Sequence, residues 1–128
     1  MILVVSAFAV HHLSLPQKTD LFQVIFDQLN IGGYFLNIDT TLPSDQIFTD
    51  WYYTLWREWV GAREKALQLE NSFTNVPDKA RKNPDNQLNP LNTQLEALKS
   101  IGFKEVDCHY KNGLFTIYSG RKKQSPVK

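Results

Sequence analysis

The sequence predicts an α/β fold in which two parallel strands are followed by an antiparallel hairpin, with flanking helices on both faces of the sheet. Residues 2–5 and 34–38 are apolar, β-rich runs separated by a segment with helical periodicity, and a connection of that length joins parallel strands. The Asn-Gly pair at 112–113 lies between two further strand-like runs and is typical of a hairpin turn. The chain has 128 residues, which is below a typical domain of ~150, so one core is expected.

Composition and charge indicate a globular protein without a strong electrostatic field. The 14 basic and 13 acidic residues give a net charge of +1, which argues against a nucleic-acid or anionic-membrane partner. Hydrophobic residues make up 42% of the chain and charged residues 21%. The single cysteine, Cys108, excludes an intramolecular disulfide and a cysteine zinc cluster. A reducing compartment, the cytoplasm, is therefore expected.

No membrane segment is expected, because no apolar run approaches the ~20 residues that span a bilayer. Residues 1–10 resemble the core of a signal peptide, but no Lys or Arg precedes them. We therefore interpret Ile2–Val5 as a strand. Its apolar residues are consecutive rather than alternating, which is typical of a strand buried on both faces between two neighbours.

The first part of the chain, up to Asp39, is predicted to form a strand, a helix and a second strand. Ser14 and Gln17 have the spacing of a capping box, with Pro16 in the first turn. The helix carries apolar residues at helical spacing and ends at Gly32-Gly33, and the second strand follows at 34–38, just before Asp39.

A second helix is expected from Pro43 to Ala66, with an apolar stripe at steps of three and four residues: Phe48, Trp51, Tyr52, Leu55, Trp59, Ala62 and Ala66. The high content of Asn and Pro in residues 70–89 predicts that this segment is a mobile loop. Asn89-Pro90 is expected to begin a helix that ends at Gly102. Strands are expected at 104–110 and 114–119, and the expected sheet order is first, second, last, third.

Four phrases of the sequence, in this order, resemble the C-terminal half of class I S-adenosylmethionine-dependent methyltransferases. Val4–Leu13 resembles the segment that leaves the fourth strand of the family, and Leu29–Leu36 the phrase before the fifth. Leu98–Phe103 resembles the phrase that leads into the sixth strand, and the Asn-Gly hairpin matches the reversed seventh. The resemblance implies a partial Rossmann-like methyltransferase sheet, a half-domain over residues 1–120. The basic and small residues of 121–128 predict a disordered tail.

The sequence departs from the family pattern in two ways. Ile31 stands where the family usually has proline, and no Gly-x-Gly turn for the cofactor is present. The resemblance therefore implies an incomplete chain: a fragment, a mis-started reading frame or one half of a split protein. Such a chain is not expected to bind S-adenosyl-L-methionine alone, and whether it is an enzyme by itself stays open. We expect the Ile2–Val5 edge to pair with the missing half or with itself.

Candidate site residues follow the ends of the first two strands and lie on the aromatic helix. Ligands of open parallel sheets bind beyond the carboxyl ends of the strands, and an imidazole there can act as a base. The expected acceptor is a small molecule or a modified nucleotide. The catalytic candidates are His11 and His12; the resemblance implies cofactor contacts from Ser6, Ala7 and Phe8; the substrate candidates are Asp39, Trp51 and Tyr52.

Each assignment has a structural alternative. The histidines can simply cap the loop and the next helix, Asp39 can be a solvated carboxylate, and the aromatic stripe can be core. Metal binding is not expected, because Cys108 and His109 have no apparent third ligand. The alternative function is a non-catalytic interaction protein that associates through its open sheet edge and aromatic helix.

Overall fold

The computed structural model describes residues 1–69, 73 and 75–124. Its described residues form one four-stranded sheet in the order β1-β2-β4-β3, with β1 parallel to β2 and the other neighbours antiparallel. This confirms the predicted fold class, sheet order and hairpin. The strands are β1 (Leu3–Ala7), β2 (Tyr34–Thr40), β3 (Lys104–Asn112) and β4 (Phe115–Arg121).

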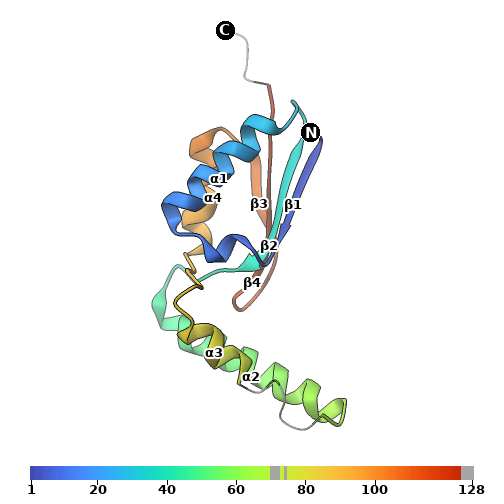
Figure 1. Ribbon diagram of the computed structural model, residues 1–128, viewed down its shortest axis with the longest axis vertical. Coiled ribbons are helices and arrows are strands. Elements are labelled where there is room, and N and C mark those ends of the chain that lie inside the picture. The colour runs from blue at the N-terminus through green and yellow to red at the C-terminus, as the bar shows by residue number, and fades with distance from the viewer. Residues whose placement is uncertain (70–72, 74, 125–128) are drawn as a thin grey trace.

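The longer helices form two groups (Figure 1). The helices α1 and α4 lie together beside the sheet, whereas α2 and α3 project from the end at which β1 and β2 finish. Two short 3-10 helices, η1 and η2, follow the ends of β1 and β2. The bounds are η1 (Val10–His12), α1 (Leu15–Gln28), η2 (Gln46–Phe48), α2 (Thr49–Ala66), α3 (Val76–Lys82) and α4 (Leu91–Ile101).

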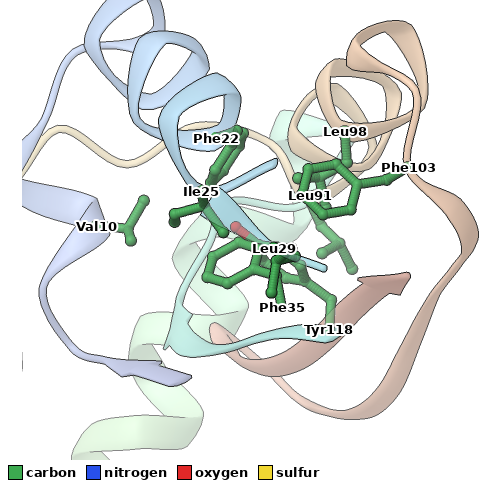
Figure 2. Packing of buried hydrophobic residues seen from close by; sticks show 9 residues of the cluster. All are labelled: Val10, Phe22, Ile25, Leu29, Phe35, Leu91, Leu98, Phe103 and Tyr118. Carbon is green, nitrogen blue, oxygen red and sulfur yellow. The ribbon is translucent and has the colours of Figure 1, made fainter. Parts of the chain in front are cut away.

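The hydrophobic core lies between the sheet and the pair α1 and α4 (Figure 2). Phe22 of α1 and Phe35 of β2 are fully buried, with ring centroids 5.6 Å apart. A buried polar chain crosses this core: Asn37 donates to the Tyr118 hydroxyl over 2.8 Å, and that hydroxyl donates to Gln94 over 2.7 Å. Burial also raises the pKa of Tyr118. These bonds tie β2, β4 and α4 into one unit.

The other face of the sheet carries no helix among the described residues, so the expectation of helices on both faces is wrong. Side chains alternate along β1 and β2, which leaves Leu3 and Val5 exposed on this face next to Tyr34 and Leu36. β1 is also an edge strand. Apolar side chains thus line both a bare face and an unpaired edge.

The expected helix starts are met at α1 and shifted at the other two helices. Ser14 and Gln17 form the predicted capping box. α2 begins only at Thr49, because Asp45 caps η2 first. At α4 the N-cap residue is Pro90 rather than Asn89. The side chain of Asn89 is instead held by another partner, described below.

For residues 43–89 the structure decides between two alternatives for the aromatic stripe and corrects the predicted loop. The predicted apolar stripe of α2 is largely exposed, and its buried residues are Tyr53, Val60 and Glu64. The segment predicted as a loop contains α3, which two ion pairs fasten to α2. In those pairs, Arg57 contacts Asp78 at 2.9 Å and Arg81 contacts Asp50 at 2.6 Å.

The β3–β4 turn differs from the expected Asn-Gly turn. Its loop residues are Gly113 and Leu114, since Asn112 already pairs with Phe115. Only Gly113 has a positive φ, 59°, as in a type II′ turn. Arg121 ends β4, one residue inside the predicted tail, and residues 125–128 of that tail lie outside the described residues. In the described part of the chain, no helix is long and apolar enough to cross a membrane.

Candidate functional site

His11 and Asp39 meet where β1 and β2 end. η1 follows β1 and carries His11, whereas Asp39 is the next-to-last residue of the neighbouring strand. The Nδ1 atom of His11 lies 2.5 Å from Oδ1 of Asp39, and the backbone N–H of His11 donates to Oδ2 over 2.8 Å. Parallel strands bring these positions together because their carboxyl ends share one edge of the sheet. Both oxygens of the carboxylate therefore hold one histidine.

The Asp39 side chain is 1% exposed and that of His11 is 12% exposed. Asp39 is further fixed by the Thr40 N–H, which donates to Oδ1, and by the Thr116 hydroxyl, which donates to its carbonyl oxygen. A carboxylate only accepts hydrogen bonds, so Nδ1 of His11 carries the proton and Nε2 presents its lone pair. This arrangement is typical of a general base whose orientation a buried carboxylate sets.

His11 forms part of the wall of a cavity of about 300 Å³. Phe8, which directly follows β1, and Phe115 of β4 line one side of it. Tyr53 and Trp56 line it from α2, and Asn86 lines it from the segment after α3. The Arg81 guanidinium lies 4.7 Å from the centroid of the Tyr53 ring. Burial raises the pKa of the Tyr53 hydroxyl, and Arg81 partly opposes this shift. The cavity thus pairs one imidazole with four aromatic side chains, those of Phe8, Tyr53, Trp56 and Phe115.

Phe8 has a left-handed backbone conformation at the mouth of this cavity, with φ of 54°. A bulky side chain rarely adopts such an angle, because its Cβ approaches the neighbouring carbonyl oxygen. The Phe8 N–H donates to the Ile38 carbonyl over 2.8 Å, and its ring lies edge-on to Phe115 at 6.4 Å. These contacts fix a strained turn beside His11, a feature that clusters at functional sites.

Residues 85–89 form hydrogen bonds with His11 and His12, the last two residues of η1. The Gln87 N–H donates to the His11 carbonyl over 2.7 Å, and the Gln87 side chain donates to the His12 carbonyl over 3.1 Å. The Nδ1 atom of His12 lies 3.2 Å from the Asp85 carbonyl oxygen. His12 is exposed and does not line the cavity, although its ring is 4.1 Å from that of His11.

Lys18 of α1 braces the same segment from inside the protein. Its ammonium donates to the Gln87 carbonyl and to Oδ1 of Asn89, each over 2.5 Å. The residue is 1% exposed. Desolvation by burial lowers the pKa of Lys18 to about 8, and the Asp39 carboxylate partly opposes this shift. The brace thus fixes the segment that holds the backbone of His11 and His12.

The structure brings together some of the predicted site residues and separates others. His11, Asp39 and Phe8 lie at one site, although Asp39 sits behind His11 and not on the cavity wall. Ser6 and Ala7 end β1 at the open edge. Neither Trp51 nor Tyr52 lines this cavity.

Sequence reasoning missed Tyr53 and Trp56, which line the cavity from α2. They are three residues apart and so share a helix face, but the stripe beside them has the more regular apolar periodicity and was therefore chosen as the candidate face. No group of three or more His, Cys, Asp or Glu side chains able to hold a metal ion occurs among the described residues.

Known structures share this arrangement of elements. The structure named "PigF with SAH" superposes with a TM-score of 0.62 at 15% identity, covering 94% of this chain and 30% of that one. An O-methyltransferase family protein from Burkholderia thailandensis gives 0.61 at 12% identity, covering 97% of this chain and 31% of that one. Human N-acetylserotonin methyltransferase in complex with SAM gives 0.60 at 17% identity, covering 95% and 29%.

The chain has part of a methyltransferase fold. It spans about 30% of the length of these structures. At identities this low the likeness shows the fold alone. No protein-family model and no curated protein matches the sequence. The partial methyltransferase fold places the His11–Asp39 pair at the carboxyl ends of its two parallel strands.

Proposed function

We propose that this chain supplies the acceptor side of an S-adenosyl-L-methionine-dependent methyl transfer. The observation that carries the proposal is the His11–Asp39 pair beside an aromatic cavity, in a fold shared with structures named as methyltransferases. His11 Nε2 accepts the proton that the acceptor gives up, and Asp39 stabilises the imidazolium that forms. His12 supports the turn and takes no proton from the acceptor.

The acceptor is a small molecule or a nucleotide whose planar part lies against the wall formed by the Phe8, Trp56 and Phe115 rings. A cavity of about 300 Å³ suits a ring system of one or two rings. Asn86, at its wall, offers an amide to a polar substituent. Trp51 and Tyr52, which the sequence suggested as substrate contacts, lie outside this cavity and are not part of the proposed acceptor site.

S-adenosyl-L-methionine, when bound, supplies an activated methyl group, so protein side chains need only align the acceptor and remove its proton. In this chain the residues that fit the cofactor are Ser6, Ala7 and Phe8, whose backbone lies at the open end of β1. They form one wall, and the sequence holds no Gly-x-Gly turn for the opposite one. The chain alone is therefore expected to bind the cofactor weakly.

The opposite wall comes from a partner in this proposal. The exposed edge of β1 and the bare sheet face give that partner an apolar surface. The partner is either a segment equivalent to the N-terminal half of such a domain or a second copy of the chain through the Ile2–Val5 edge. Association thus belongs to the transferase function rather than replacing it. The cytoplasm remains the expected compartment.

Alkylation by p-bromophenacyl bromide tests the assignment of His11, because the reagent carries an aromatic ring and reacts with a free imidazole nitrogen. The nucleophilic nitrogen bonds to the methylene carbon and bromide leaves. Peptide mapping by mass spectrometry gives the rate at each of the three histidines. We expect His11 to react at least about tenfold faster than the more exposed His12, since its Nε2 is oriented and lies beside a ring-binding cavity.

Asp39→Asn is the companion variant and is expected to slow alkylation of His11 while leaving His109, which contacts Ser119, unchanged. Equal rates at all three histidines in the wild-type chain would rule out His11 as the oriented base. The cofactor wall is tested separately by NMR titration with S-adenosylhomocysteine at millimolar concentration. Shifts of the amides of residues 6–8 support it, and their constancy contradicts it.

A further inference from the structure

A second, larger hollow lies between α2 and the β3–β4 hairpin, with a volume of about 680 Å³. We call it the hairpin groove. Trp56, Leu114 and Phe115 border both this groove and the His11 cavity, so they form a partition between the two. The Trp56 and Phe115 rings meet edge to face, with centroids 5.1 Å apart. His11 is not part of the groove wall.

The two walls of the groove are aromatic. Tyr52, Trp56 and Trp59 line it from α2, and Tyr110 and Phe115 line it from the strands. Trp59 and Tyr110 are both largely exposed, so their side chains are accessible to a ligand. Facing aromatic walls favour a flat ring system that can stack between them.

The lining of the groove carries one formal charge, that of the Glu58 carboxylate. Among the described residues this carboxylate has no hydrogen bond or ion pair. The ammonium of Lys111 lies 5.2 Å from the centroid of the Tyr52 ring, so the face of one wall ring already holds a cation. The faces of aromatic rings attract cations through their quadrupole, and tryptophan does so most strongly.

We propose that the hairpin groove binds a flat aromatic cation, stacked against Trp59 with its positive charge beside Glu58. The Lys111 ammonium already contacts the Tyr52 ring, although Lys111 does not itself line the groove, so we place the ligand charge at the Trp59 end. The three features required are present in one place: two ring-lined walls, a carboxylate without a partner and a resident cation on a wall ring. The proposal does not depend on methyl transfer.

The test compares two probes of the same shape, N-methylquinolinium and its uncharged isostere 1-methylnaphthalene, with 1-naphthoate as the anion. NMR titrations follow the indole N–H signals of the three tryptophans. We expect the cation to bind at least about fivefold more tightly than the neutral isostere, and the anion to bind most weakly. Tighter binding of 1-methylnaphthalene than of N-methylquinolinium would overturn the proposal.

Matched variants locate the site. Trp59 is 60% exposed and Trp51 is 54% exposed, both on α2, but only Trp59 lines the groove. Trp59→Ala should lower the affinity for N-methylquinolinium at least about fivefold, whereas Trp51→Ala should leave this affinity unchanged. Glu58→Gln should abolish the preference for the cation. Equal losses in Trp59→Ala and Trp51→Ala would contradict the site. The rate of His11 alkylation should stay constant in Trp59→Ala, which separates this test from that of the proposed function.

Discussion

The ammonium of Lys18 donates to the side-chain oxygen of Asn89, 71 residues further along the chain, from a position that is 1% exposed. The same ammonium holds the Gln87 carbonyl, and Gln87 in turn holds the backbone of His11. A buried amine on the first long helix therefore sets the position of the candidate base. Deleting the amine leaves two partly buried acceptors without their donor, a loss that destabilises proteins.

Lys18 gives the stability of the protein a specific dependence on pH. Burial lowers the pKa of Lys18 in the folded state to about 8, below the ordinary lysine pKa of 10.5 that applies to the unfolded chain. Between these values the unfolded state binds more protons, so the free energy of unfolding rises with pH, by at most ~1.4 kcal/mol per pH unit. Urea unfolding between about pH 8 and pH 9.5, below the ionisation of tyrosine, should show this rise. It should vanish in Lys18→Met, and an equal rise in that variant would contradict the assignment.

Asp39→Asn should change the protonation of His11. An asparagine amide can turn its N–H₂ group toward Nδ1, so the tautomer with the proton on Nε2 becomes populated. We expect the long-range ¹H–¹⁵N NMR spectrum to show Nδ1–H in the wild-type protein and a mixture in the variant. The tautomer of His109 serves as the internal control. A pure Nδ1–H signal in Asp39→Asn would show that another group fixes the ring.

Val5→Lys should reduce self-association. Val5 is 52% exposed on the bare face of the sheet, and a charge on an edge strand opposes pairing with a second edge. Val24→Lys is the matched control, because Val24 is 56% exposed but lies on α1. Sedimentation velocity over a range of concentrations measures the effect. If both variants associate like the wild-type chain, the β1 edge is not the contact.

Two glycine substitutions are expected to act in opposite directions. Gly113 has a φ of 59° at the hairpin turn, so Gly113→Ala should destabilise the protein by about 1 kcal/mol. Gly61 lies inside α2, and a Cβ added there meets nothing within 4 Å. Gly61→Ala should therefore stabilise the protein by about 0.5–1 kcal/mol. Chemical denaturation, analysed with one m-value for all variants, measures the free energy of unfolding of each. A change of the same sign in both variants would contradict this account.

Local patterns were predictable from the sequence because their causes are local. Ser14 and Gln17 cap a helix through bonds within one turn, and consecutive apolar residues mark β1 as a strand wherever it lies. The sheet order followed from the parallel crossover and the hairpin. His11 and Asp39 were identified because both follow strand ends, although the carboxylate proved to contact the histidine and not the cavity.

The remaining features depend on distant partners. The buried face of α2 passes through Tyr53 and Val60, one residue away from the predicted stripe, because α3 and the cavity cover that side. Residues one position apart on a helix differ by about 100°, so a small shift changes the face completely. Periodicity gives the width of an apolar stripe but not which element covers it. The burial of Lys18 likewise required the position of Asn89, which no local pattern encodes.

The place of β2 in the sheet sets the order in which the protein can fold during synthesis. β2 pairs on one side with β1, about 30 residues earlier, and on the other with β4, where Tyr34 is opposite Arg121. While residues 115–121 are still inside the ribosome, a nascent chain therefore has one side of β2 unpaired. The Thr116 bond that steadies Asp39 is also missing at that stage. The candidate site therefore reaches its final geometry only after β4 has been translated and has paired with β2.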